Sequence, residues 1–291
     1  MEPKCQYELP EDIKVLSFPI RDYSFRPPEE FYLRVAIPVS EWLNRGGSVL
    51  IHCMGGIGRS GTAVAMILRH AYNLNMSEAL RRVKKFGDGP ESRIQELVLH
   101  WFDRALTLLG KESWRRVLEF ALQYNFGNGI EHASTVANIA LDVLEALGPG
   151  YGIHKAHLKA AYIAGIFHDL GRAEVGNGHH KVSVEIAKRF KDLEKLANPD
   201  IVFKAIYHHR RSTDLLGDSE LASLGKGAVI TAAAVRLADA FSSVYNWEQY
   251  EGVYIKDQEL KVKGNPLKSR FIKKSQALAT ASKLKAKLEL V

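Results

Sequence analysis

The run from Ser48 to Thr62, SVLIHCMGGIGRSGT, constrains the first third of the chain more than any other stretch. Its apolar start predicts a strand that reaches His52 and Cys53, a glycine-rich loop follows, and the apolar periodicity of residues 63–68 predicts a helix. A glycine-rich loop between a strand and a helix can present successive backbone N–H groups at the positive end of the helix. The sequence therefore predicts an anion-binding loop.

The residue types in this loop suit phosphate chemistry. The expected phosphate-binding residues are Met54, Gly55, Gly56, Ile57, Gly58 and Arg59. A guanidinium can bind two phosphate oxygens at once. A thiol at the strand end that faces this positive environment should have a pKa below the free-cysteine value of about 8.5, which makes Cys53 a candidate nucleophile. The alternative is a buried cysteine that ends a core strand, with glycines that only form a tight turn.

The order His52, Cys53, five residues, Arg59 and Ser60 resembles the signature of the cysteine-dependent protein-tyrosine and dual-specificity phosphatases. The resemblance implies a phosphomonoesterase with a phosphocysteine intermediate. Cys53 would attack phosphorus, Arg59 would bind the phosphoryl oxygens, and Ser60 would help the thiolate to leave. His52 would orient the loop.

Two further segments resemble parts of that family. Pro19-Ile20-Arg21-Asp22 has the form of its general-acid segment, so Asp22 is the expected proton donor to the leaving oxygen. The alternative is that Asp22 only begins a turn. Gln95, in the segment GPESRIQ, resembles the glutamine that positions the hydrolytic water. Family members have more chain before the acid segment, which leaves two interpretations: a reduced sheet, or a start assigned too late.

The periodicity of the chain predicts two domains of different class. Residues 1–110 read as an α/β domain, with a short parallel sheet flanked by helices. Its expected helices cover residues 28–43, 62–72, 77–86 and 91–109, with a possible kink at Pro38 and Ser77 as an N-cap. Residues 111–291 read as all-α, with a small hairpin at residues 253–263 and a last helix from Leu267. Their other expected helices cover residues 114–124, 130–147, 155–170, 179–190, 201–207 and 228–245.

Histidines gather in the second half in an unusual setting. Most of the 11 histidines lie after residue 130. The side chains of interest follow or interrupt apolar runs, and they are His132, His168, Asp169, His179, His180, His208, His209 and Asp239. Imidazoles and carboxylates are transition-metal ligands, and each buried polar group otherwise needs a partner of its own. The alternative is a polar core without metal.

The segment IFHDLG around His168 and Asp169 resembles the HD superfamily of metal-dependent phosphohydrolases. The resemblance implies a binuclear site that holds iron, manganese, zinc or a similar divalent metal. The implied ligands of the first ion are His132, His168, Asp169 and Asp239. Asp169 would bridge to a second ion, whose further implied ligands are His180, His208 and, as an optional member, His209. Such a pair polarises phosphate and supplies a hydroxide nucleophile.

Three other segments resemble the C-terminal domain of the exopolyphosphatase and guanosine-pentaphosphate phosphatase family. They are GHHKVS at residues 178–183, YHHRR at 207–211 and RLADA at 236–240. Because that family's main catalytic domains are absent, the resemblance implies a fold and not a substrate. Basic side chains flank the implied metals and are candidates for neutralising a polyanion: Arg172, Lys181, Arg210 and Arg211.

Composition narrows the setting. The 291 residues are 46% hydrophobic, with two cysteines and no stretch that stays apolar long enough to span a bilayer. The first residues lack an apolar signal core, and a catalytic thiolate needs reducing conditions, so we expect a cytoplasmic protein without a membrane partner. The net charge of +7 suits anionic substrates. The basic residues near the C-terminus fit a solvated helix face better than a nucleic-acid site.

These observations favour a bifunctional phosphohydrolase that acts on a phosphorylated protein or small molecule. The cysteine phosphatase would need no cofactor, and the HD domain would hydrolyse a phosphorylated small molecule or nucleotide. The alternative is a cysteine phosphatase regulated by a non-catalytic HD domain that senses a metal or nucleotide. A nucleic-acid-binding protein is a third hypothesis, which rests on charge alone. The sequence leaves the substrates, the metal identity and the oligomeric state open.

Overall fold

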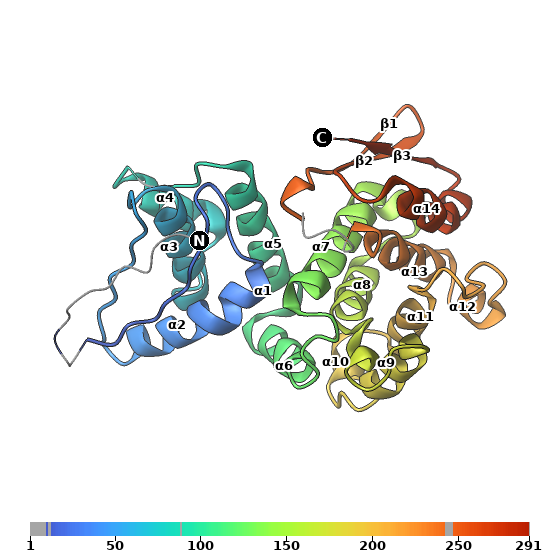
Figure 1. The fold of residues 1–291 in the computed structure, drawn as a ribbon, viewed down its shortest axis with the longest axis horizontal. Coiled ribbons are helices and arrows are strands. Elements are labelled where there is room, and N and C mark those ends of the chain that lie inside the picture. The colour runs from blue at the N-terminus through green and yellow to red at the C-terminus, as the bar shows by residue number, and fades with distance from the viewer. Residues whose placement is uncertain (1–9, 11–12, 88, 242–246, 291) are drawn as a thin grey trace. The chain divides into compact units, whose positions relative to one another are not determined.

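The computed structural model describes residues 10, 13–87, 89–241 and 247–290. The chain divides into two compact units, residues 1–107 and 108–291, and each is described by itself. The helices of the first unit are α1 (Pro28–Phe31), the π-helical η1 (Tyr32–Ala36), α2 (Ile37–Asn44), α3 (Gly58–Ala71), α4 (Met76–Lys84) and α5 (Arg93–Leu109) (Figure 1). Among the described residues, no helix is long and apolar enough to cross a membrane.

The first helix begins and ends close to the predicted positions and contains an irregular turn. Residues 28–44 form one helical stretch, in which the π-helical turn Tyr32–Ala36 ends two residues before Pro38. Proline lacks a backbone N–H, and its ring collides with the carbonyl four residues earlier, so a regular α-helix cannot continue through it unchanged. The wider turn accommodates Pro38, which is the local disturbance that the sequence predicts.

Aromatic side chains form the core of the first unit. Phe31 and Tyr32 from the first helical stretch lie with ring centroids 6.3 Å and 6.1 Å from Phe102 of α5. Tyr32 also contacts His70 of α3, with ring centroids 5.1 Å apart. These contacts join α1, η1, α3 and α5 around one cluster, whose rings bury large apolar areas. The core of this unit is therefore formed by packing between its helices.

The structure differs from the prediction in the sheet of the first unit. The sequence also predicts a short strand at residues 15–20, before the acid segment, but residues 15–20 and 48–53 belong to no strand or helix. Parallel sheets are stable when both faces are buried. Here Val15 is 66% exposed and Leu50 is 87% exposed, so these segments lie on the surface of the helices. Ser77 is also not the N-cap of α4, because the side chain of Asn75 accepts the hydrogen bond from the N–H of Glu78 at 2.8 Å.

The second unit is helical, with a small sheet near the C-terminus, as predicted (Figure 1). Its α-helices are α6 (Lys111–Leu122), α7 (Ile130–Leu147), α8 (Lys155–Phe167), α9 (His179–Ala187), α10 (Leu193–Leu196), α11 (Pro199–His208), α12 (Ser219–Ser223), α13 (Lys226–Ala238) and α14 (Lys268–Ser282). Short 3-10 turns are η2 (Pro149–Tyr151), η3 (Leu170–Ala173) and η5 (Trp247–Gln249). The last part of the predicted helix 228–245, residues 242–245, lies outside the described residues.

The sheet contains the predicted hairpin and one further strand. β1 (Gly252–Lys256) pairs antiparallel with β2 (Glu259–Lys263), and Asp257 and Gln258 connect them with φ of 54° and 57°. Two consecutive residues with positive φ are typical of the hairpin turn that matches strand twist. β3 (Lys285–Glu289) pairs parallel with β2, which gives the order β1-β2-β3. α14 is thus the crossover between two parallel strands.

Helices α7 and α8 approach closely at one glycine. A Cβ atom at Gly165 would lie 2.4 Å from Cα of Ala137 and 2.7 Å from its backbone nitrogen. No side chain larger than hydrogen fits at this position without moving a backbone. Gly165 lies three residues before His168. The contact therefore also fixes the position of the end of α8, which His168 directly follows.

We expect Gly165→Ala to destabilise the second unit by roughly 1–3 kcal/mol, because the added methyl group overpacks the contact between α7 and α8. The measurement is the denaturant midpoint of the full chain. Gly150→Ala is the matched control, because a Cβ there meets open space and φ is not positive. Equal losses in the two variants would contradict this account of the helix contact.

Candidate functional site

The predicted anion loop of the first unit joins an extended segment to α3. Gly56 has a φ of +75°, in the left-handed region that glycine adopts without strain. Its N–H donates to Sγ of Cys53 at 3.2 Å. A Cβ atom at Gly58 would lie 2.2 Å from Oε2 of Glu91 and 3.0 Å from Oε1 of Gln95. Glycine at position 58 therefore lets the segment before α5 approach the start of α3.

The surroundings of Cys53 lower the pKa of its thiol. Partial burial raises this pKa, but the Ser60 hydroxyl, the N–H groups of Ser60 and Gly56, and the charge of Arg59 together outweigh burial. The Ser60 hydroxyl is buried and is engaged by no other hydrogen-bond partner within the described part of the chain, which leaves it available to the sulfur. These groups stabilise a thiolate, the form of cysteine that acts as a nucleophile.

The predicted acid segment meets the predicted phosphate-binding arginine. The Arg59 side chain is 7% exposed, and one of its nitrogens donates to the carbonyl of Ile20 at 2.9 Å. Another lies 3.1 Å from Oδ1 of Asp22, whose side chain is 62% exposed. The chain thus brings Asp22 to the loop from a segment 37 positions earlier than Arg59. The carboxylate holds the guanidinium where a phosphoryl group would need it.

Gln95 lies beside the loop but is engaged by backbone groups. Its Oε1 accepts from the N–H of Glu91 at 2.8 Å, and its Nε2 donates to the carbonyl of Ser24 at 3.4 Å. The side chain therefore ties the start of α5 to the turn after Asp22. His52 likewise turns to the backbone, with Nδ1 3.3 Å from the carbonyl oxygen of Cys53. Both residues support the loop in this arrangement.

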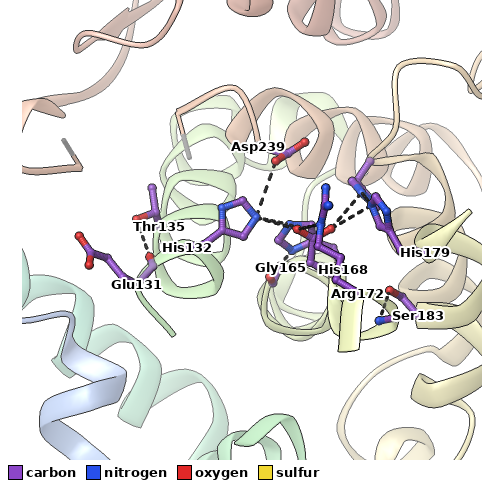
Figure 2. Close-up of polar contacts among 12 residues, drawn as sticks. Glu131, His132, Thr135, Gly165, His168, Arg172, His179, Ser183 and Asp239 are labelled. Carbon is purple, nitrogen blue, oxygen red and sulfur yellow. Dashed lines mark hydrogen bonds and ion pairs between the residues drawn. The ribbon is translucent and has the colours of Figure 1, made fainter. Parts of the chain in front are cut away.

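The histidines of the second unit converge from several helices (Figure 2). His132 lies on α7, and His168 and His209 stand directly after α8 and α11. His179 is the first residue of α9, which can approach because a Cβ at Gly171 would lie 2.3 Å from its carbonyl oxygen. Two groups of ligand atoms result: His132, His168 and Asp169, and Asp169, His179 and His209.

Three of these imidazoles have their tautomer fixed in the same way. Nδ1 of His168 contacts the carbonyl of Gly165 at 2.7 Å, Nδ1 of His179 contacts that of Gly176 at 3.0 Å, and Nδ1 of His209 contacts that of Ile206 at 2.6 Å. A carbonyl only accepts, so each Nδ1 carries the proton. In each neutral ring, Nε2 is then left with a lone pair. This arrangement orients metal-ligating histidines in proteins.

The ligand atoms lie close together, but too few of them carry a proton for all of them to be hydrogen-bonded to one another. Nε2 of His132 lies 2.9 Å from Nε2 of His168 and 3.1 Å from Oδ2 of Asp169. Nε2 of His179 lies 3.3 Å from Nε2 of His209 and 3.1 Å from Oδ1 of Asp169. That Oδ1 atom is buried and forms no hydrogen bond within the described residues. Clustered lone pairs around a buried carboxylate fit a bound cation.

Burial keeps these groups in the protonation states that a metal requires. Burial, aided by the nearby His132 and Lys274, lowers the pKa of His168 to about 3, although Asp169 opposes this shift. Burial and His168 likewise hold the pKa of His209 well below its usual range. Burial raises the pKa of Asp169, but the neighbouring imidazoles outweigh it and lower that pKa. Neutral imidazoles and an ionised carboxylate are the ligating forms.

The predicted ligands of the second ion need a correction. His179, and not His180, faces Asp169, because neighbouring residues on a helix point about 100° apart. The ring of His180 instead packs on Tyr207, with centroids 5.2 Å apart. His208 uses both ring nitrogens elsewhere, Nδ1 at 3.0 Å from Oγ1 of Thr213 and Nε2 at 2.8 Å from Oδ2 of Asp218. Only the optional member, His209, joins the second group.

Asp239 lies at the edge of the first group and has partners that sequence reasoning missed. Its Oδ1 is 3.9 Å from Nε2 of His132. At this distance both atoms can bind the same metal ion. Asp239 also pairs with Lys274 and, at 3.1 Å, with Arg270, both on α14. Burial lowers the pKa of Lys274 to about 7. α14 carried no motif, so only its basic composition could have drawn attention to it.

A cavity of about 340 Å³ opens beside Asp239. Three of the four basic residues predicted near the metals line it, namely Arg172, Arg210 and Arg211. The fourth, Lys181, is exposed on α9 and is not among the lining residues. Arg172 also contacts Oδ2 of Asp169 through Nε at 2.6 Å (Figure 2). The cavity therefore joins a basic surface to the predicted metal ligands.

Comparisons with known families agree with this arrangement. Residues 4–96 match the family model described as Swiss Army Knife protein, DSP-PTPase phosphatase domain. Residues 129–243 match the model of the HD domain. No curated protein was found to match the chain. Neither model describes the exopolyphosphatase family, so that resemblance stays a prediction.

The chain therefore joins two phosphohydrolase-type domains. Its first part is a phosphatase domain of the DSP-PTPase class, and its second part is an HD domain. HD domains are generally metal-dependent, and the histidine and aspartate groups around Asp169 are chemically suited to divalent metals. The predicted boundary after Gly110 lies close to the division between the compact units at residues 107 and 108.

We expect alkylation of Cys53 by iodoacetamide to have its pH midpoint below that of a free cysteine, because hydrogen-bond donors and Arg59 stabilise the thiolate. Ser60→Ala removes one of these groups and should raise the midpoint. The measurement is the modification rate of the peptide that contains Cys53, followed by mass spectrometry. A midpoint in the wild type at or above that of a free cysteine would contradict the assignment.

We expect about two metal ions per chain, one for each ligand group, and a loss of both in Asp169→Asn because both groups share its carboxylate. His208→Gln is the matched control, since His208 is buried but directed to Thr213 and Asp218. It should lower stability and keep the metal. Metal analysis of the purified variants tests this, and metal loss on His208→Gln would restore His208 as a ligand.

Proposed function

We propose that the first unit hydrolyses phosphomonoesters through Cys53. The observation that carries this is the convergence of a thiol with a lowered pKa, a buried arginine and an aspartate on one glycine-rich loop. The Cys53 thiolate attacks phosphorus, and the bond from phosphorus to the leaving oxygen breaks. Asp22 gives its proton to that oxygen. Water then cleaves the phosphocysteine, with Asp22 taking the proton and Ser60 donating to the departing sulfur.

The ion pair between Asp22 and Arg59 fits this sequence of events. In the free protein the Asp22 carboxylate lies 3.1 Å from the Arg59 guanidinium. A phosphoryl group that binds Arg59 replaces the carboxylate and brings negative charge next to it. Substrate binding would thus release the Asp22 side chain beside the loop, where it can donate a proton to the leaving oxygen.

We further propose that the HD domain hydrolyses a phosphorylated small molecule or nucleotide. His132, His168, Asp169 and Asp239 would hold one ion, and Asp169, His179 and His209 a second. When bound, such ions polarise a phosphoryl group and supply hydroxide at neutral pH. The carbonyl contacts of His168, His179 and His209 hold their Nε2 atoms in place. Arg172, Arg210 and Arg211 would bind phosphoryl oxygens from the cavity.

The two proposed chemistries should separate in one experiment, because a thiolate mechanism needs no metal and the HD site needs no thiol. Cys53→Ser should lower turnover of an aryl phosphate roughly a thousandfold or more. Vanadate should also block that turnover, whereas a chelator should spare it. Only the chelator should stop hydrolysis of nucleotides by the HD site.

Mononucleotides, dinucleotides, cyclic dinucleotides and polyphosphate form the substrate panel. Full aryl phosphatase activity in Cys53→Ser would refute the first proposal. If metal is bound, no panel member is hydrolysed and metal loading changes the rate of the Cys53 reaction, the HD domain is a regulatory module instead of an enzyme.

A further inference from the structure

The cavity beside Asp239 is lined almost entirely by cations. Its positively charged side chains are Arg172, Arg210, Arg211, Arg270, Lys273 and Lys274, and its other lining residues are Asp239 and two serines. Four of the nine lining residues come from α14, which lies outside the residues that match the HD domain model. Nearly half of the lining residues therefore come from a part of this chain that the family model does not cover.

The carboxylates at the cavity do not balance this charge. Arg172 is paired with Asp169, and Arg270 and Lys274 are paired with Asp239. Within the described part of the chain, the side chains of Arg210, Arg211 and Lys273 form no hydrogen bond or ion pair. Even without Lys274, five cations face two carboxylates, which leaves an excess of three positive charges. Metal ions at the neighbouring ligands would add to that excess.

The lining also limits what the occupant presents to the cavity. None of the nine lining residues is apolar or aromatic, so a base or sugar ring would meet only the aliphatic parts of charged and polar side chains. Its volume of about 340 Å³ lies at the low end of the roughly 300–1,000 Å³ of small-molecule sites. A phosphate monoester carries only about two negative charges at neutral pH, fewer than the excess in the cavity. Additional phosphoryl groups on the same molecule would supply the remaining negative charge.

We propose that this cavity binds a small molecule through two or more neighbouring phosphoryl groups, and that α14 selects it over monophosphates. Lys273 is the selecting side chain most easily tested, because it lines the cavity, is exposed and pairs with neither Asp169 nor Asp239. The proposal names the substrate class of the HD site and rests on the function proposed above for that site. Anion binding by the cations of the wall needs no metal.

The probes are orthophosphate, pyrophosphate and tripolyphosphate, titrated by calorimetry into the full chain after removal of metal and at constant ionic strength. Affinity should rise with each added phosphoryl group. Lys273→Gln should weaken tripolyphosphate roughly tenfold, as expected for one lost charged hydrogen bond, and change orthophosphate little. Lys268→Gln is the matched control, because it removes the same charge from an exposed position of α14 outside the cavity.

Equal affinity for orthophosphate and tripolyphosphate would overturn the proposal, and so would equal effects of Lys268→Gln and Lys273→Gln. ATP that binds tenfold more tightly than tripolyphosphate and is not weakened by Lys273→Gln would show recognition of the nucleoside in place of the phosphoryl groups and would also overturn it. A loss specific to Lys273→Gln assigns the binding to this cavity and not to the loop at Cys53. Tripolyphosphate that binds in this way, but is not hydrolysed after metal loading, supports the binding site and refutes catalysis there.

Discussion

The second unit depends on one buried carboxylate. Asp169 is 2% exposed, and a carboxylate removed from water costs several kcal/mol unless it is paired and hydrogen-bonded. His132, His179 and Arg172 lie within 3.1 Å of its oxygens and come from α7, α9 and η3. The charge of Asp169, which lies between α8 and η3, can be accommodated in the core only while these elements stay assembled around it. The polar centre and the fold of this unit therefore stabilise each other.

Both proposed sites present positive charge to an anion, but they use different groups to do so. In the first unit, the backbone N–H of Gly56, the dipole of α3 and one buried arginine surround the place expected for a phosphoryl group. In the second, side-chain cations and metal ligands on several helices do so. A backbone loop is local in sequence, whereas the second arrangement requires a folded bundle. The first site is accordingly compact in the sequence and the second is dispersed.

This difference decides how much could be predicted from the sequence. The loop at Cys53 and the pair His168-Asp169 were recognisable because each lies within a few consecutive residues. The choice between His179 and His180 depends on the rotation of α9 against α8, which local patterns do not specify. The role of Lys274 depends on the packing of α14 against α13. The missing sheet of the first unit is a tertiary outcome too, since apolar segments such as 13–20 became surface chain.

The contacts of Asp239 would connect the proposed metal binding with the proposed phosphate binding. In the metal-free chain, Arg270 and Lys274 neutralise this carboxylate, which is also an expected metal ligand. An ion that takes Asp239 as a ligand supplies the positive charge in their place, and the two side chains then become available to an anion in the cavity that they line. If both proposals hold, binding of the ion would favour binding of a polyphosphorylated compound. By linkage the compound would favour the ion to the same extent, and α14 would connect the two through Asp239.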